Sequence, residues 1–181
     1  MTLKRALFAI VLPTLMASTG FAQSTPSSTP PAPIDGVSGP LSDSVLEQLA
    51  GSWTTTRTSW RGTTVSRVEA EWVLNHQFLC LHYEDMATPS SYEAIVFIGY
   101  DSTSDRYVVH WIDVFGGRFS ETLGYGTRVP AGIRFVFEYP DGPFVNVFTF
   151  NRSKHEWLSQ MRRKNARGEW VSFADETFKR P

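Results

Sequence analysis

The side chains suited to acid–base chemistry in this sequence are four histidines and a few carboxylates set among aromatic residues. His82 follows Phe78 and Cys80 at intervals of two, and residues two apart lie on one face of a strand. If this face is turned inward, His82 lies in a water-poor interior, where it could act as a general base. The spacing of the histidines does not match a metal site, and we expect neither a metal ion nor a cofactor.

Asp113 is the carboxylate in the most aromatic surroundings, on the same strand face as Tyr107 and Trp111. A carboxylate buried among rings is costly unless a donor or a ligand meets it, so an inward Asp113 predicts a binding or catalytic role. The residue also lies just before the turn expected at Gly116, and at a barrel rim it would instead bond the loop backbone. Both interpretations fit the sequence.

Six tryptophans could line a cavity or simply fill a core. We keep both interpretations, and we expect ligand contacts among aromatic and polar side chains of the strands. The candidate ligand-binding residues are Trp53, His82, Tyr100, Tyr107, Trp111 and Asp113.

The elements that must position these residues are strands, because polar and apolar residues alternate in short segments separated by turn residues. The alternation is clearest over residues 132–139, so one face of that segment must be buried. We count about ten strands by this pattern. They cover residues 52–60, 64–74, 77–86, 92–100, 106–115, 118–125, 132–139, 144–150, 156–162 and 169–178.

The turns between these segments are short, which favours antiparallel pairing of neighbours. Gly116-Gly117 suits a two-residue turn with positive φ, and residues 140–143 suit another tight reversal. So many strands in one small domain tend to close, since closure removes exposed edges. We therefore predict an all-β, meandering antiparallel barrel, with a two-sheet sandwich of the same strands as the alternative.

One short helix is predicted over residues 42–51, ahead of the first strand. Ser44 and Glu47 have the spacing of a capping box, and Leu46 and Leu49 share one face. Gly51 can take the closing position with positive φ. We expect this helix to lean on the barrel or to plug it.

The N-terminal residues predict export. Residues 1–22 have two basic residues, an apolar run and small residues, as in a secretory signal peptide cleaved after Ala22, and the run is too short for a permanent membrane span. Residues 23–40 are rich in Ser, Thr and Pro and read as a disordered tether before a single barrel domain at 41–181. We expect a periplasmic or secreted protein.

The charge of the chain argues against nucleic acid as a partner, and its cysteine content excludes an intramolecular disulfide. The formal net charge is −1, and loss of Lys4 and Arg5 with the leader would make it −3, which disfavours nucleic-acid binding. The basic cluster at residues 162–167 surrounds a turn and reads as a solvated hairpin tip. Cys80 is the sole cysteine, so an intramolecular disulfide is impossible.

Several motifs resemble known families. The segment Leu46-x-x-Leu49-x-Gly51-x-Trp53 resembles the helix-to-strand entry of calycin-like barrels. Residues 99–101 (Gly-Tyr-Asp), 106–108 (Arg-Tyr-Val) and 111–113 (Trp-Ile-Asp) resemble a bacterial family of lipocalin-like proteins known only as a domain of unknown function. The opening at 51–57 departs from the pattern of nitrobindin-type haem barrels. The resemblance implies a lipocalin-like fold over residues 46–178 and small-ligand binding without haem.

Three functional hypotheses follow. The first is a barrel that holds a small apolar or amphipathic molecule among aromatic side chains. The second is an enzyme that uses an inward His82 or Asp113 as general base. The third is a filled barrel that presents its outer surface or loops to a partner in the cell envelope.

Overall fold

The computed structural model describes residues 39–181, which form a closed antiparallel barrel of ten strands. The expected leader and nearly all of the expected tether lie outside the described residues. Two short helices accompany the strands, α1 (Ser44–Leu49) and α2 (Gly117–Ser120). The strands are β1 (Gly51–Ser59), β2 (Gly62–Val73), β3 (Phe78–Asp85), β4 (Glu93–Asp101), β5 (Arg106–Asp113), β6 (Leu123–Val129), β7 (Gly132–Tyr139), β8 (Gly142–Asn151), β9 (Glu156–Lys164) and β10 (Trp170–Lys179).

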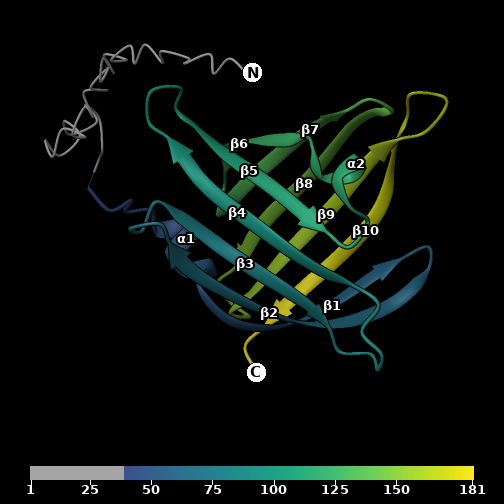
Figure 1. The fold of residues 1–181 in the computed structure, drawn as a ribbon, viewed down its shortest axis with the longest axis horizontal. Helices are drawn as coiled ribbons and strands as arrows, with labels where there is room; N and C mark the ends of the chain where they lie inside the picture. The colour runs from purple at the N-terminus through teal and green to yellow at the C-terminus, as the bar shows by residue number, and fades with distance from the viewer. Residues whose placement is uncertain (1–38) are drawn as a thin grey trace, which may run out of the picture. The chain divides into compact units, whose positions relative to one another are not determined.

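The strands pair in the order in which they follow one another along the chain, and β1 pairs with β10 to close the ring (Figure 1). All ten pairings are antiparallel, including the closing one, which runs from Thr54 opposite Lys179 to Ser59 opposite Ala174. A closed ring leaves no sheet edge unpaired. The predicted all-β meandering barrel is confirmed, and the sandwich alternative is wrong.

The strand predictions hold to within a few residues except in one connection. Residues 118–125 were expected to form a strand after a tight turn at Gly116-Gly117, but this stretch contains α2, and β6 begins only at Leu123. The longer connection is held against β5, because the Asp113 N–H donates to the Ser120 Oγ at 3.3 Å and the His110 ring lies 2.7 Å from the Ser120 carbonyl oxygen. The tight reversal expected at residues 140–143 is present, with Tyr139 opposite Gly142.

The predicted helix before the first strand exists, but Asp43 rather than Ser44 opens it. The Asp43 Oδ1 accepts from the backbone N–H groups of Val45 at 2.9 Å and Leu46 at 3.0 Å. Its other oxygen accepts from the Tyr107 hydroxyl at 2.6 Å and from Arg128 Nη2 at 2.5 Å. Asp43 therefore caps the helix and ties its start to β5 and β6.

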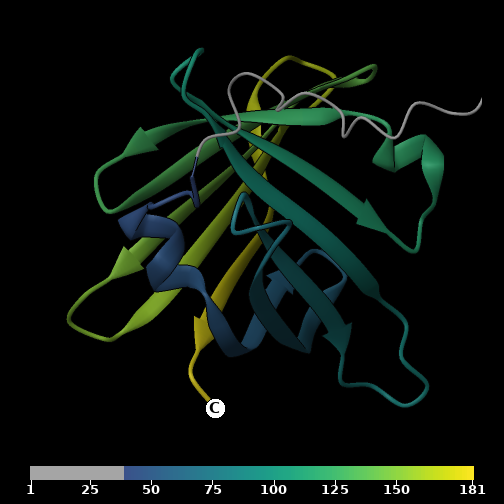
Figure 2. The ribbon, with the colours of Figure 1, turned by 60° about the vertical axis from the view of Figure 1, so that its left-hand side comes forward.

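The last turn of α1 is bound by two indoles from the barrel wall. Trp53 Nε1 donates to the Leu49 carbonyl at 2.7 Å, and Trp157 Nε1 donates to the Gln48 carbonyl at 3.2 Å. Carbonyls at the end of a helix have no partner within it, so these indoles satisfy groups that would otherwise be buried without a bond. Leu46, within the helix, has a side chain that is completely buried. Figure 2 shows α1 beside the β6–β7 and β8–β9 connections.

The barrel thus has two different ends. The α1 end carries the helix and the β2–β3, β4–β5, β6–β7 and β8–β9 connections; the distal end carries the five connections that follow β1, β3, β5, β7 and β9. Near α1 the interior is filled by rings in contact, such as Phe135 with Phe148 and Phe148 with Phe178, whose centroids lie 6.0 and 5.8 Å apart. No helix among residues 39–181 is long and apolar enough to cross a membrane.

Asp43→Ala is expected to lower the free energy of unfolding by about 3 kcal/mol. About 1 kcal/mol comes from the lost cap and about 2 kcal/mol from the buried Tyr107 hydroxyl, which loses its acceptor, and the half-exposed Arg128, which loses its ion-pair partner. Ser44→Ala, one residue along, should cost less than about 0.5 kcal/mol. Urea unfolding of both variants measures the difference, and equal losses would contradict Asp43 as the cap.

Candidate functional site

A mostly buried ion pair crosses the seam at which the barrel closes. Arg57 of β1 and Glu176 of β10 are directly opposed in the register, and Arg57 Nη2 lies 3.3 Å from Glu176 Oε2. The Arg57 side chain is 19% exposed and the Glu176 side chain is fully buried. Both residues belong to inward-facing rows, Arg57 with Trp53 and Thr55 and Glu176 with Phe178. Both charges of such a pair have lost contacts with water, and neighbouring groups must offset this cost with other favourable interactions.

Aromatic side chains surround the guanidinium of Arg57. Its Cζ lies 5.2 Å from the ring centroid of Tyr92 and 6.0 Å from that of Tyr83, within the range of cation–π attraction. Burial alone would lower the pKa of Arg57, but the Glu176 carboxylate and the two tyrosines outweigh it and raise the pKa. Arg57 therefore stays charged although it is mostly removed from water.

Trp111 and Asp113 of β5 extend this group toward the distal end. Trp111 Nε1 donates to the Tyr92 hydroxyl at 3.0 Å. Burial raises the pKa of Asp113, against the opposing effects of the Phe115 N–H and the Arg57 charge. Burial and the Asp113 carboxylate together raise the pKa of Tyr139 to about 12.

Four buried polar atoms of this region have no hydrogen-bond partner among residues 39–181. They are Thr55 Oγ1, Arg57 Nε, Tyr83 Oη and Glu176 Oε1. Such atoms are rare in protein interiors, because each loses its bonds to water without a replacement. Their convergence on β1, β3 and β10 makes the Arg57 group the candidate site. We call it the Arg57 cluster and define it as Arg57, Tyr83, Tyr92, Trp111, Asp113 and Glu176.

Two of the six residues predicted from the sequence, Trp111 and Asp113, lie in the Arg57 cluster. As expected for a residue at the barrel rim, Asp113 accepts from the Phe115 backbone N–H at 3.0 Å. The Arg57 charge also acts on its carboxyl group, and its role in binding or catalysis stays a prediction.

Three other predicted residues lie near the α1 end and have structural partners there. Trp53 bonds the helix, Tyr107 bonds Asp43, and Tyr100 donates to Asp105 in the β4–β5 hairpin. The Tyr100 and Tyr107 rings pack edge to face, with centroids 5.1 Å apart. The structure therefore places these three with the filled part of the interior rather than with the Arg57 cluster.

The expectation that His82 points into the barrel is wrong. Its side chain is 47% exposed, and its Nε2 lies 2.8 Å from Glu93 Oε1 on the outer face of the wall. The inward row of β3 is Leu79, Leu81 and Tyr83. His82 and Asp113 thus lie on opposite faces of the sheet and cannot act together on one substrate.

The sequence reasoning missed Arg57, Tyr83, Tyr92 and Glu176. A signal was present for Arg57, which continues the inward row of Trp53 and Thr55, because a charged residue in a buried row predicts a partner or a function. Glu176 lies two positions before Phe178 and offered the same signal. Their pairing required the register of the closing seam, which joins residues 119 positions apart.

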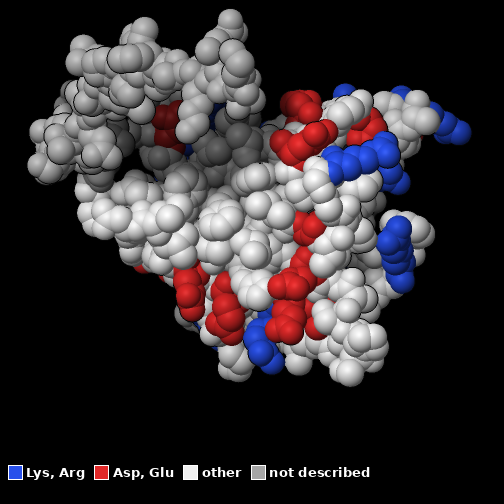
Figure 3. Space-filling model, viewed as in Figure 1, with Lys and Arg blue, Asp and Glu red and all other residues white. Residues whose placement is uncertain are grey.

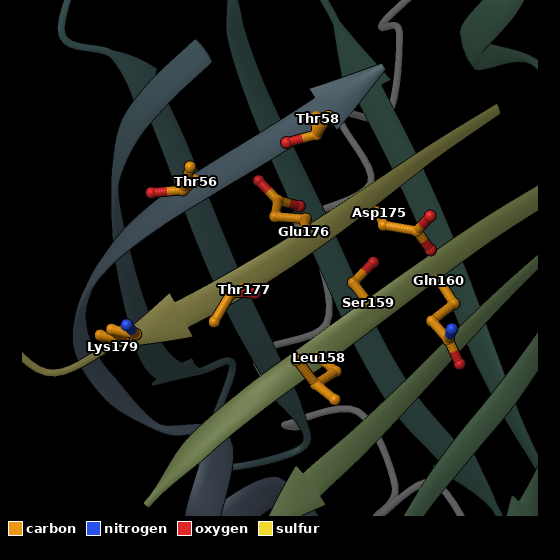
Figure 4. A pocket seen from close by; sticks show the side chains of 9 residues that line it. All are labelled: Thr56, Thr58, Leu158, Ser159, Gln160, Asp175, Glu176, Thr177 and Lys179. Atoms are coloured by element: carbon orange, nitrogen blue, oxygen red, sulfur yellow. The ribbon is translucent and has the colours of Figure 1, made fainter. Parts of the chain in front are cut away.

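A separate hollow of about 390 Å³ lies on the outer wall over β1, β9 and β10 (Figure 4). Its lining comes mainly from outward positions such as Thr56, Thr58 and Gln160. In Figure 4 the side chains of Leu158 and Gln160 point to one side of β9 and that of Ser159 to the other. Ser159 and Glu176, whose side chains are buried, also border the hollow, but its other lining residues occupy outward positions, and we do not assign it to the site.

The donor set of the Arg57 cluster does not suit a metal ion. Within the described part of the chain, no group of three or more His, Cys, Asp or Glu side chains is arranged to hold one. The cluster combines one cation, two carboxyl groups and aromatic rings. Groups of these kinds can form hydrogen bonds and apolar contacts with an organic molecule.

The fold and this cluster define a small all-β barrel with an interior ion pair and a helix at one end. Residues 42–180 match the family described as "Protein of unknown function (DUF1579)". The match covers most of the chain, and the protein therefore belongs to the DUF1579 family. A comparison with curated proteins finds no match.

A double-mutant cycle tests the seam pair. Glu176→Gln and Arg57→Met should each lower the free energy of unfolding by about 3 kcal/mol, since each leaves a buried partner unpaired, while the double variant should cost less than the sum. The matched control is the exposed pair Arg162–Asp175, at 2.8 Å on the neighbouring strands, whose coupling should stay below about 1 kcal/mol. Additive losses at Arg57 and Glu176 would contradict the assignment.

Asp113→Asn should stabilise the protein at about pH 7 by up to about 1 kcal/mol, a value reduced for the partial exposure of the group. Because the native pKa of Asp113 is raised above its ordinary 3.8, the folded state binds the proton more tightly, and stability falls as pH rises through the native value. The advantage of the variant should therefore vanish below about pH 3.8. Denaturant unfolding across this range measures it, with Asp141→Asn in the exposed β7–β8 turn as control. A difference that is independent of pH would contradict the assignment.

Proposed function

We propose that this protein is an exported binding barrel that takes one small amphipathic molecule at its distal end. The single observation that carries the proposal is the Arg57 cluster, in which polar atoms without partners are buried beside aromatic rings. A few well-placed polar groups within an apolar lining are typical of small-molecule sites. The inward side chains nearest the distal end, including Tyr92, Trp111 and Tyr139, are only partly buried.

The charges of the cluster favour an uncharged polar head group. Arg57 is already paired with Glu176, and Asp113 adds a second carboxyl group nearby. An anionic head would face two carboxyl groups, and a cationic head would face the guanidinium. A hydroxyl or amide group can both accept from a donor such as Arg57 and donate to a carboxylate, so it meets both kinds of group without a net charge.

The aromatic side chains at the distal end suit the apolar part of such a molecule. Phe115 lies against Tyr92, with ring centroids 6.0 Å apart, and Phe173 lies against Phe144 at 5.2 Å. Phe115 and Phe173 are both exposed on their other sides. These rings lead from the solvent toward the cluster and offer an apolar surface at low cost in conformational entropy.

The lipocalin-like resemblance supports the same proposal at the level of the fold. In this chain the Gly-Tyr-Asp motif builds a hairpin, since the Asp101 Oδ1 accepts from the N–H groups of Thr103 at 3.0 Å and Ser104 at 3.2 Å. A side chain at Gly99 would meet the Phe78 ring at 2.6 Å. We infer that the motif serves folding, whereas Trp111 and Asp113 serve binding.

Export is part of the proposal. It rests on the layout of residues 1–22, with its basic start, apolar run and small residues before the expected cleavage. An amphipathic molecule outside the cytoplasm is sparingly soluble in water, and a barrel with one ring-lined end would carry it.

Intrinsic tryptophan fluorescence tests the proposal with three probes of equal chain length: decanol, decanoate and decylamine. Decanol should bind about tenfold or more tightly than either charged probe, because only an uncharged head matches the cluster. Asp113→Ala and Phe115→Ser should each weaken decanol binding about tenfold, while His82→Asn on the outer face should leave it unchanged. Tightest binding of a charged probe, or no binding of any probe, would contradict the proposal.

A further inference from the structure

Exposed apolar side chains gather at the distal end. Leu74, in the β2–β3 connection, is the large exposed apolar residue of the described connections at the α1 end, and its exposed fraction is 68%. At the distal end Trp60 is 73% exposed, Phe119 55% and Trp170 48%. Further exposed apolar residues in or beside the distal connections are Met86, Val114, Phe115 and Phe173. Patches of this kind mark surfaces that meet a partner.

Three of these exposed rings, those of Trp60, Phe119 and Trp170, each have a basic side chain over them. Arg61 Cζ lies 4.8 Å from the Trp60 ring centroid, and Arg118 Cζ lies 5.7 Å from that of Phe119. Lys164 Nζ lies 5.6 Å from the Trp170 ring centroid. These pairs belong to three separate connections, β1–β2, β5–β6 and β9–β10. We call the three pairs the distal ring–cation pairs.

The exposed charges of the distal end are divided between its connections. The β1–β2 and β9–β10 connections, on strands that pair with each other, carry Arg61, Arg163, Lys164 and Arg167 against Glu169. The exposed acidic residues Glu84, Glu93, Glu138 and Asp141 lie in or beside the β3–β4 and β7–β8 connections, and Arg118 and Glu121 share the β5–β6 connection. Figure 3 shows blue side chains at the right-hand edge, where the β1–β2 and β9–β10 hairpins lie in Figure 1.

We propose that the distal end docks on the surface of an anionic lipid membrane. Tryptophan and phenylalanine rings partition into the interfacial region of a bilayer, and basic side chains beside them remain with the anionic head groups. Attraction between exposed basic groups and an anionic leaflet adds to the affinity. Three ring–cation pairs on three connections give contacts spread round one end of the barrel, which suits a flat lipid surface better than a narrow peptide.

Docking at this end goes beyond ligand binding and does not require it. The rings of Trp60, Phe119 and Trp170 are separate from the Arg57 cluster, so either activity can fail while the other remains. If both hold, the end that meets the lipid is the end at which an amphipathic molecule enters. The barrel would then exchange its ligand with the bilayer rather than with bulk water.

Sedimentation with vesicles tests the docking. Phosphatidylcholine vesicles are compared with vesicles in which roughly a quarter of the lipid is phosphatidylglycerol, and wild type should bind the anionic vesicles about tenfold more tightly. The triple variant Trp60→Ser/Phe119→Ser/Trp170→Ser should lose about tenfold in binding, and Arg61→Gln/Arg118→Gln/Lys164→Gln should lose the preference for anionic lipid. Leu74→Ser, an equally exposed apolar side chain at the α1 end, should bind as wild type.

All variants are made in the full chain, so that residues 1–38 contribute equally to each. Fluorescence quenching gives a second readout. Vesicles with brominated lipid chains should quench the fluorescence of Trp60 and Trp170 in wild type. The Trp60→Phe/Trp170→Phe variant should lose most of this quenching. Absence of binding to anionic vesicles, unchanged binding of the triple variant, or an equal loss in Leu74→Ser would each overturn the proposal. Quenching that survives in Trp60→Phe/Trp170→Phe would overturn it as well.

Discussion

The ion pair between Arg57 and Glu176 is the constraint on which the rest of this barrel depends. It lies at the seam between the first and last strands, where the two residues are directly opposed in the register. A slip of one residue would turn every inward side chain of β10 outward and would leave Arg57 buried without its partner. The pair therefore favours one register between β1 and β10 when the barrel closes. It also fixes a charged group among aromatic rings inside the barrel, which is the origin of the proposed binding site.

The two ends of the barrel differ in structure because α1 is bound at only one of them. Asp43 accepts from two N–H groups at the start of the helix, and the indoles of Trp53 and Trp157 donate to two carbonyls at its end, so side chains bond the backbone at both termini. Near the helix the interior is filled by aromatic rings in contact. The distal end instead combines the partly exposed side chains of the cluster with exposed rings and basic residues. Binding and docking are both proposed for that end.

Local patterns predicted most of the fold, whereas the site depended on contacts between distant parts of the chain. Alternation and turn residues set the strands, and ten strands joined by short turns favour closure. The pattern could not show which face of β3 is inward, because Phe78 and Cys80 make the row of His82 as apolar as the row of Leu79 and Leu81. Trp111 and Asp113 were found because their strand is conspicuously aromatic. Arg57, whose charge acts on Asp113, was missed together with Glu176, since Arg57 and Glu176 meet only through closure of the barrel.

The central claim is that the Arg57 guanidinium, held by Glu176, contacts the polar group of a bound molecule. Nitrogen-15 NMR of the arginine Nε–H groups tests it most directly, with the Arg57 signal assigned by its loss in Arg57→Lys. Addition of decanol should shift the Arg57 Nε–H signal and slow its exchange with water, while the Arg128 signal at the α1 end stays in place. A ligand that shifts the Arg128 signal and leaves the Arg57 signal unmoved would contradict the account.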